Sequence, residues 1–264
     1  MRCAVIGHTE WVEFARVPAM PAPGEIVHAE EIWQEPGGGG AVVARQIARL
    51  AGGCDFFTAL GDDELGHAAE SCLQRLEVNL QVEWTGMSGT RRAWVHVDRD
   101  GERTITVLGD KLLPDTTGPF DTYDLVFFVS GTVEALRAAR AARFLAATLR
   151  ELPTLRAAGV PLDLLVGSAS DPGEREDGTL AAGIVVSTEG EAGGTANGER
   201  YAAAKPPGPV VDSYGAGDSF AAALAFALAR GDEVGPSLEL AARAGAAVLA
   251  GRGPYAAQLD RMAP

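Results

Sequence analysis

The sequence predicts an α/β domain in which helices cover a largely parallel β-sheet. Short β-rich runs alternate with helical patterns along the chain, an order that is typical of parallel sheets. With 264 residues, of which 47% are apolar, the chain can bury a large core in one big domain or two small ones. Neither an internal repeat nor a long low-complexity linker interrupts it. We therefore expect a single domain over residues 1–264 with a small β appendage.

Hydrophobic periodicity places the expected elements in chain order. The expected core strands cover residues 2–6, 55–59, 125–129, 162–166 and 183–187. The expected helices cover residues 40–50, 66–76, 133–143, 218–230 and 238–249. Residues 171–180 are charged and contain Gly and Pro, so this segment is expected to be a surface loop.

Two segments break this rhythm and predict a β-lid. Residues 25–34 read as an extended strand that follows a proline-rich stretch. Residues 91–97 and 104–108 alternate apolar and polar around Asp98-Arg99-Asp100-Gly101, which is the pattern of a hairpin. Small antiparallel pieces inserted into an α/β domain often form a lid or an interface. We expect lid segments at about residues 11–36 and 88–110.

Composition narrows the classes of partner. Lys and Arg number 22 against 36 Asp and Glu, and the net charge of −14 argues against a nucleic-acid partner. The longest apolar stretches, such as residues 220–229, are too short to span a bilayer, so no membrane partner is expected. The N-terminus runs straight into a strand-like segment without a signal-peptide pattern, and three separated cysteines suit a reducing compartment. These features predict a cytoplasmic location, and the scattered histidines predict no structural zinc site.

A turn near the C-terminal end carries the strongest chemical pattern. Gly215, Ala216 and Gly217 precede Asp218 at the start of an apolar helix, which leaves backbone N–H groups free to attract an anion. A carboxylate beside an anion site suits a general base that activates a hydroxyl for attack on a phosphate. The same residues also fit an ordinary loop closed by an Asp N-cap, worth about 1 kcal/mol.

A glycine loop forms the second pattern. Pro36 is followed by Gly37-Gly38-Gly39-Gly40, which open the expected helix 40–50. Glycines let the backbone approach a ligand closely. The loop is not a P-loop, because Gly-Lys-Ser/Thr does not follow, and its spacing does not match the dinucleotide fingerprint. Taken alone, it fits a flexible turn equally well.

Together these motifs resemble those of the PfkB-type carbohydrate kinases, also called the ribokinase-like family. The family's N-terminal signature is a Gly-Gly run opening a helix, with a downstream Gly-Asp-Asp-x-x-Gly element that matches residues 61–66. Its C-terminal signature, Asp-Thr-x-Gly-Ala-Gly-Asp-x-Phe or a close variant, matches residues 212–220. The resemblance covers nearly the whole chain. It implies a three-layer α/β/α ribokinase-like fold with a largely parallel central sheet and a small β-lid.

The resemblance also implies roles for particular residues. Asp218 would deprotonate the acceptor hydroxyl, while the amides of Gly215, Ala216 and Gly217 would hold the charge on the transferred phosphoryl group. ATP and Mg²⁺ are the implied cofactors. The implied nucleotide-binding residues are Thr188, Glu189, Gly190, Ala244, Gly245 and Ala247, and the implied substrate-binding glycines are Gly38, Gly39 and Gly40. The small residues at 244–247 suit close helix packing equally well.

The sequence departs from the family pattern near the expected substrate. Val42 stands where relatives carry an Asn that binds a substrate hydroxyl, and His8 or Glu10 stands in for an Asp after the first strand. Ser168 and Asp171 replace an Asn-x-x-Glu element, with Asp171 as the candidate for placing Mg²⁺. Tyr214 occupies a position where Thr is frequent, which leaves activation by a monovalent cation open.

Three functions remain open on these grounds. The leading one is an ATP-dependent kinase that phosphorylates a hydroxyl of a sugar or sugar-like molecule. The second keeps the fold and takes a nucleoside or another non-sugar alcohol as acceptor. The third is a nucleotide- or sugar-binding protein with little turnover. The family also implies a possible homodimer through the β-lid.

Overall fold

A single large sheet forms the body of the molecule. The computed structural model describes residues 1–86, 88–174 and 178–260. Within them, nine strands lie in the order β13-β12-β11-β10-β9-β8-β1-β4-β5. Their bounds are β1 Cys3–Ile6, β4 Asp55–Gly61, β5 Asn79–Thr85, β8 Leu125–Phe128, β9 Leu145–Thr148, β10 Leu162–Ser168, β11 Ala182–Thr188, β12 Gly194–Ala196 and β13 Glu199–Tyr201. All neighbours from β5 to β11 are parallel, and β12 and β13 add antiparallel pairs at one edge.

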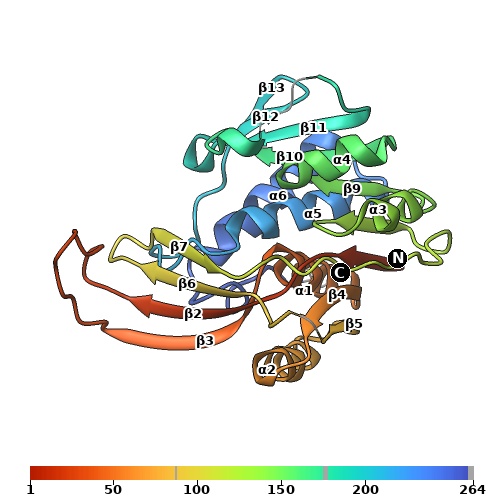
Figure 1. The fold of residues 1–264 in the computed structure, drawn as a ribbon. Coiled ribbons are helices and arrows are strands. Elements are labelled where there is room, and N and C mark those ends of the chain that lie inside the picture. Colours follow the sequence, from red (N-terminus) through yellow and green to blue (C-terminus); the bar gives the residue numbers. More distant parts are fainter. Residues whose placement is uncertain (87, 175–177, 261–264) are drawn as a thin grey trace.

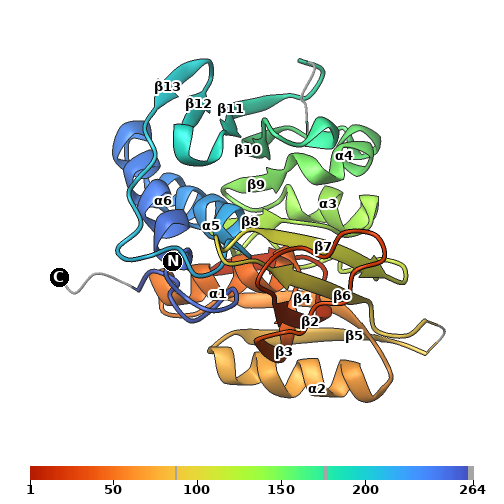
Figure 2. The same ribbon diagram turned by 90° about the vertical axis from the view of Figure 1, so that its left-hand side faces the viewer.

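Helices cover both faces of this sheet, so the fold has three layers (Figures 1 and 2). The helices are α1 Gly39–Ala51, α2 Glu64–Leu73, α3 Val133–Ala139, α4 Leu152–Ala158, α5 Ala216–Arg230 and α6 Val234–Val248. Short 3₁₀ turns lie at Gln74–Leu76, Leu149–Glu151, Pro172–Glu174 and Gly190–Ala192. One core cluster joins α1, α5 and α6 to alternate residues of β1 and β8, and a second joins α3 and α4 to the residues between them. This alternation is what a sheet buried on both faces requires.

A second, four-stranded sheet forms the lid that projects from the body in Figure 1. Its order is β3-β2-β6-β7, with bounds β2 Glu10–Arg16, β3 Glu31–Gly37, β6 Arg92–Val97 and β7 Arg103–Leu108. The face turned to the body buries Val12, Phe14 and Val95. They pack together with Tyr214, which lies in the body segment that leads into α5. The lid is therefore packed onto the segment that precedes the predicted phosphate-binding turn.

The Gly-Asp-Asp-x-x-Gly element, residues 61–66, links the start of α2 to the chain that enters the lid. The Asp63 side chain caps α2 by accepting a hydrogen bond from the Gly66 N–H at 2.7 Å. The same carboxylate accepts from the N–H and the hydroxyl of Thr90, each at 2.7 Å. Thr90 lies two residues before β6, so one side chain fixes both the start of α2 and the entry of the chain into the lid hairpin.

The predicted fold class is confirmed, and the differences concern element bounds and short elements. Every predicted core strand and helix is present. The predicted strand at 25–34 has the wrong bounds, because β3 spans Glu31–Gly37 and residues 25–29 form no strand. Helix α3 ends at Ala139 rather than at 143, and α6 begins at Val234 rather than at 238. Of the predicted surface loop 171–180, residues 175–177 lie outside the described residues.

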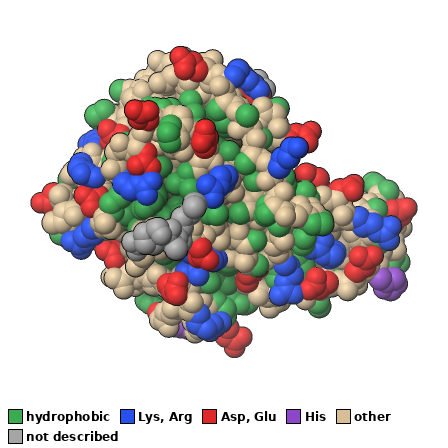
Figure 3. Space-filling view, turned by 180° about the vertical axis from the view of Figure 1, so that it is seen from behind, with side chains coloured by type: hydrophobic (Ala, Val, Ile, Leu, Met, Phe, Trp, Pro, Cys, Tyr) green, Lys and Arg blue, Asp and Glu red, His purple; other side chains and the backbone are tan. Residues whose placement is uncertain are grey.

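Within the described ranges, no helix combines the length and the apolar character needed to cross a membrane. In the view of Figure 3, acidic and basic side chains are interspersed over the body and over the projecting lid. This face carries no continuous basic area of the kind that a nucleic-acid backbone would need.

Candidate active site

A cavity of about 740 Å³ lies between the lid and the sheet edge where the parallel strands end. Parallel strands deliver their carboxyl ends to one edge, so the residues that follow them converge there. The cavity is lined by the residues after β1, the start of α1, the start of α5, the ends of β8 to β11, and the inner face of the lid. It therefore collects most of the predicted site residues from segments that lie far apart in sequence.

The two glycine motifs meet in this cavity. A methyl group added at Gly39 would lie 2.9 Å from Asp218 Oδ1, so Gly39 leaves room for that carboxylate. Gly215 caps α5 with a positive φ of 84°, a conformation that side chains rarely adopt, and this turn aims the start of α5 at the cavity. The Gly38 N–H donates to the Tyr214 hydroxyl at 3.0 Å. The predicted base thus lies directly beside the glycine loop.

Electrostatics make Asp218 a candidate base. Burial raises the pKa of this carboxyl, and the charge of Arg103 opposes that rise most among its neighbours. A raised pKa brings a carboxylate closer to the basicity that proton abstraction requires. Asp218 lines the cavity. Its carboxylate is therefore both reachable by a ligand and more basic than an exposed aspartate.

The amides at the start of α5 divide into two groups. Gly215 and Gly217 line the cavity, and the space beside Gly217 is open, because nothing lies within 4 Å of a Cβ placed there. Ala216 does not line the cavity, and its N–H lies 3.4 Å from the Ser213 carbonyl oxygen. Gly215 and Gly217 therefore face the cavity, whereas the amide predicted at Ala216 already has a partner in the Ser213 carbonyl oxygen.

His8 and Glu10 both face the cavity from the chain that joins β1 to the lid. The Glu10 carboxylate is 6% exposed, lies 3.3 Å from Arg91 Nε and accepts from the Tyr214 hydroxyl at 3.2 Å. Burial raises the pKa of Glu10, while Arg91 and the Tyr214 hydrogen bond oppose the rise. Burial and the nearby charges of Lys111 and Arg91 hold the pKa of His8 well below its usual value, so its imidazole is neutral.

Tyr214 connects three parts of the site through one hydroxyl. We expect Tyr214→Phe to lower the free energy of unfolding by about 1–3 kcal/mol, because the Gly38 N–H and Glu10 both lose a buried partner. Urea denaturation measures this loss. Tyr255→Phe is the matched control, since among the described residues that buried hydroxyl bonds to the Pro36 carbonyl oxygen alone, and its removal should cost less. Equal stability of the two variants would contradict this role for Tyr214.

Some of the predicted nucleotide-binding residues line the far end of the cavity. Ser168 and Thr188 line it at the ends of the neighbouring strands β10 and β11. Asp171 also lines it, but its Oδ2 lies 2.8 Å from Arg150 and its Oδ1 accepts from the Gly173 N–H. Glu174 is held in the same way, between Arg150 Nε at 2.7 Å and the Ser168 N–H at 2.8 Å.

These partners bear on the predicted role of Asp171 with Mg²⁺. Both oxygens of each carboxylate are engaged, and among the described residues no group of three or more His, Cys, Asp or Glu side chains could hold a metal ion. The side chains do not form a direct metal cage. They fit an ion that is held mainly by phosphate oxygens and water.

Several predicted residues lie outside the lining of the cavity. The side chain of Val42 is buried in the lid core, where its Cγ1 would lie 3.0 Å from a Cβ at Gly215; its neighbour Val43 lines the cavity instead. A Cβ at Gly245 would lie 3.1 Å from the Ala216 carbonyl oxygen. This glycine therefore allows α6 to pack closely against α5. The other predicted residues that do not line the cavity are Gly40, Glu189, Gly190, Ala244 and Ala247.

Sequence reasoning missed the basic residues of the site. Arg91, Arg103 and Lys111 line the cavity from the lid and the chain that follows it, and Arg150 lines its other end. Arg103 donates to the backbone oxygen of Ser213 at 2.9 Å, next to the predicted phosphate-binding turn. The only sequence signal for Arg91 and Arg103 is their position at the ends of the predicted hairpin strands.

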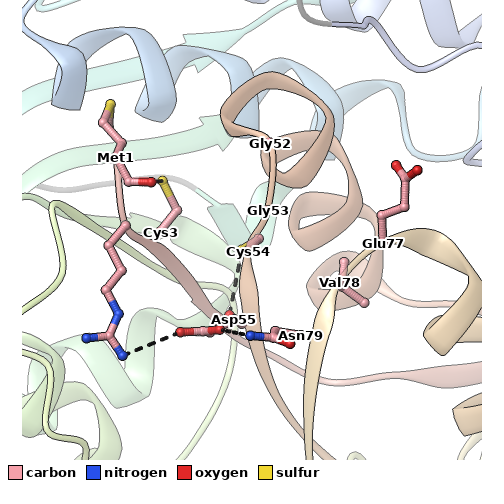
Figure 4. A pocket seen from close by; sticks show the side chains of 10 residues that line it. Met1, Cys3, Gly52, Gly53, Cys54, Asp55, Glu77, Val78 and Asn79 are labelled. Atoms are coloured by element: carbon pink, nitrogen blue, oxygen red, sulfur yellow. Dashed lines mark hydrogen bonds and ion pairs between the residues drawn. The ribbon is translucent and has the colours of Figure 1, made fainter.

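A second cavity of about 840 Å³ lies at the opposite edge of the sheet, where β1, β4 and β5 begin (Figure 4). Its most central carboxylate is Asp55, which accepts from Asn79 at 2.9 Å and from the Tyr123 hydroxyl, and lies 3.8 Å from Arg2. Its ionisable centre is thus already satisfied within the chain. None of the predicted site residues lines this cavity.

Comparison with known families agrees with this arrangement. The description "pfkB family carbohydrate kinase" matches residues 1–164 and 162–261, which include both glycine motifs and Asp218. The chain belongs to the PfkB family of carbohydrate kinases. A ribokinase from Staphylococcus aureus is 30% identical over 113 residues, which are 41% of this chain and 36% of that protein. The aligned segments span about a third of the length of the curated ribokinases that the chain matches.

Solved structures of PfkB-type and related kinases share the fold over almost the whole chain. The adenosine kinase of Sinorhizobium meliloti superposes with a TM-score of 0.79 at 20% identity, covering 96% of this chain and 95% of that one. A ribokinase of Arabidopsis thaliana, solved with ribose and ATP, superposes with a TM-score of 0.76 at 20% identity, covering 98% and 96%. At this level of identity the likeness establishes the fold.

Proposed function

We propose that this PfkB-family protein is an ATP-dependent kinase that phosphorylates a hydroxyl of a sugar or sugar-like molecule. The observation that carries the proposal is the contact between the two motifs, in which the basic Asp218 carboxylate lies beside Gly39 and opens on the same cavity as Gly215 and Gly217. A base and an anion-binding turn in one cavity supply the two functions that phosphoryl transfer to an alcohol requires.

The proposed reaction uses these groups in one step. Asp218 accepts the proton of the acceptor hydroxyl as its oxygen bonds to the γ-phosphorus of ATP. The bond between the γ-phosphorus and the oxygen that bridges to the β-phosphate breaks, and ADP leaves with that electron pair. The amides of Gly215 and Gly217 receive the charge on the phosphoryl oxygens. Mg²⁺ accompanies ATP in this proposal, and the chain's own side chains are assigned no direct bond to it.

The nucleotide is assigned to the end of the cavity near Ser168 and Thr188, and the acceptor to the end near His8 and Glu10. The ribokinase structure solved with ribose and ATP supports this type of reaction for the fold. We also assign the reaction to the cytoplasm, where ATP is available and the free thiols of Cys3 and Cys54 stay reduced. Tyr214, where Thr is frequent in the family, speaks against activation by potassium, and a comparison of the activity in potassium and choline salts would test this.

The test is direct. The protein is mixed with ATP, Mg²⁺ and a panel of sugars, and ADP formation is followed with a coupled assay. Turnover with at least one acceptor supports the kinase, whereas tight ATP binding without transfer to any acceptor supports the alternative of a binding protein with little turnover.

A nucleoside acceptor is the second candidate. It is favoured by the apolar Val43 beside the acceptor end and by the fold shared with the adenosine kinase of S. meliloti. An apolar wall suits a base ring better than a polyol. Adenosine or inosine raising the melting temperature more than any pentose or hexose would support this version.

We further propose a homodimer through the outer face of the lid. Ile32 and Trp94 lie on that face, and they are 77% and 45% exposed although large and apolar. Exposed apolar groups on a sheet face commonly mark an interface. A second copy of the chain presents the same face, so the two lids could cover each other in an isologous contact.

Replacing one side chain tests this dimer. We expect wild-type protein to have twice the chain mass in light scattering and Trp94→Glu to be monomeric, because a charge would be buried in the contact. Trp84→Glu is the control, since Trp84 is also partly exposed but lies on β5, outside the lid. A monomeric wild-type protein would contradict the proposal.

A further inference from the structure

We propose that the acceptor carries an anionic group, a phosphate or a carboxylate, which Arg91 binds at the lid end of the cavity. This inference rests on the phosphoryl-transfer function proposed above and narrows its substrate class. It starts from an imbalance between hydrogen-bond donors and acceptors around His8, Glu10, Arg91 and Lys111, a group called here the donor cluster.

Arg91 is the centre of the donor cluster. Its side chain is 15% exposed, and it lines the cavity from the residue that precedes β6. Its Nε lies 3.3 Å from Glu10 Oε2 in an ion pair, yet this buried nitrogen makes no hydrogen bond within residues 1–86, 88–174 and 178–260. A guanidinium offers five N–H donors in a planar fork that matches carboxylate and phosphate oxygens. A largely buried fork whose neighbouring acceptor is one oxygen of Glu10 keeps donors for a ligand that supplies further acceptor oxygens.

His8 adds a further donor. The Ser130 hydroxyl oxygen accepts from the His8 backbone N–H at 2.8 Å and lies 2.9 Å from Nδ1. The Ser130 hydroxyl can donate to Nδ1, and in that tautomer the proton of the neutral ring lies on Nε2; in the other tautomer Nδ1 donates to the hydroxyl and Nε2 is an acceptor. Nε2 has no partner in the described part of the chain, and His8 lines the cavity. A ligand whose oxygens only accept would select the tautomer that presents the Nε2–H to the same space as Arg91.

The only acidic member of the donor cluster has little capacity left. Oε1 of Glu10 accepts from Tyr214, and Oε2 faces Arg91. Lys111, whose Nζ contacts Glu151, keeps ammonium protons that this contact does not use. A neutral polyol suits a site with both donors and acceptors, because each hydroxyl donates as well as accepts. Oxygens that only accept suit this cluster better, and phosphate and carboxylate oxygens have that property.

The competing explanation is that Arg91 serves only to hold Glu10. In that case its loss would disturb every acceptor equally, because Glu10 would shift for all of them. The two explanations therefore differ in selectivity, and acceptors that differ by one charged group distinguish them.

Binding is measured by calorimetry with three matched pairs of probes: ribose and ribose 5-phosphate, fructose and fructose 6-phosphate, and glucose and gluconate. We expect the charged member of at least one pair to bind tenfold or more tightly than its neutral partner. A response in the phosphate pairs identifies a sugar phosphate, and a response in the gluconate pair identifies a sugar acid. Inorganic phosphate should compete with the charged member.

Arg91→Gln should weaken binding of the charged probe by about 30-fold or more and that of the neutral probe by less than threefold. Arg91→Lys, which keeps the charge without the fork, should retain part of the affinity. Arg92→Gln is the matched control, because its neighbouring guanidinium pairs with Glu13 and does not line the cavity. It should change neither affinity.

Three outcomes would overturn the inference: neutral probes that bind as tightly as charged ones, equal losses for both in Arg91→Gln, or no binding of charged probes or of inorganic phosphate. Turnover with a neutral acceptor would overturn it and leave the proposed kinase in place. Failure of the wild-type protein to bind ATP would count against the kinase itself.

Discussion

Asp218→Asn is expected to reduce kcat by about 10²–10⁴-fold, the range that a positioned general base contributes. Asparagine keeps the size of the side chain beside Gly39 but cannot accept the proton of the acceptor hydroxyl. ATP affinity should change little, because the amides of Gly215 and Gly217 remain in place. A coupled ADP assay and calorimetry with ATP separate the two effects.

The pH dependence of kcat in the wild-type enzyme should reflect the titration of the Asp218 carboxyl group. The proposed mechanism requires Asp218 as a carboxylate, so kcat should fall as the pH falls through the pKa that burial has raised. Stability should move in the opposite direction. A carboxyl whose pKa is higher in the native state than in the unfolded state stabilises the fold most below its unfolded pKa, and this contribution is lost as the pH rises through the native pKa.

The Asp218→Asn variant does not suffer this loss of stability at higher pH, because asparagine does not titrate. The melting temperature of Asp218→Asn relative to wild type should therefore increase as the pH is raised from acid to neutral. Asp232→Asn is the control, since Asp232 pairs with Arg230 outside the cavity and should change neither kcat nor this trend. An Asp218→Asn variant with wild-type kcat would show that another group is the base.

Gly40→Ala is expected to destabilise the protein by about 3 kcal/mol, at the upper end of the usual cost of overpacking. A Cβ at this position would lie 2.6 Å from both the Gly7 carbonyl carbon and the His8 carbonyl oxygen. These are backbone atoms, so relief requires α1 to move away from the end of β1. Such a movement would also displace His8, and we expect acceptor affinity to fall together with stability.

Gly235→Ala provides the control for this substitution. Apart from its chain neighbours, nothing lies within 4 Å of a Cβ added at Gly235 in α6. Pro236 follows it and disfavours helical backbone for a residue with a Cβ, which offsets the usual gain of Gly→Ala, so alanine there should change stability far less than alanine at Gly40. Thermal and urea denaturation of both variants measure the difference. If Gly40→Ala were as stable as wild type, the close contact between α1 and the end of β1 would be disproved.

Long periodic segments made most of the fold predictable from the sequence, whereas several short or edge elements were not predicted. Strand β9 has four residues in an Ala-rich stretch that reads as helix, and α4 has seven residues and begins next to a proline. Strand β5 lies at the sheet edge and is polar at alternate positions, so it lacked the apolar run of a core strand. Pairing with neighbouring strands stabilises β9 and β5, and burial of Leu155 in the core shared with α3 stabilises α4, where the local sequence specifies the conformation weakly.

The candidate site divides in a similar way. Val42, the residue expected at the substrate, does not line the cavity, because the orientation of α1 turns Val42 into the lid core and Val43 to the cavity. The small residues Ala244 and Gly245 pack α6 against its neighbours. Spacing in a helix indicates which residues share a face, but only the packed partner decides what that face meets.

The predicted anion-binding turn and its candidate base could be read from the sequence alone, because a run of small residues before a helix sets the chemistry of that helix start locally. Only the tertiary structure brought this turn to the glycine loop, with Gly38 and Tyr214 joined by a hydrogen bond across 176 positions of the chain. It also placed Arg91 beside His8 and Glu10. The acceptor end is assembled from distant segments of the body and lid, so its charge could not be read from any one of them.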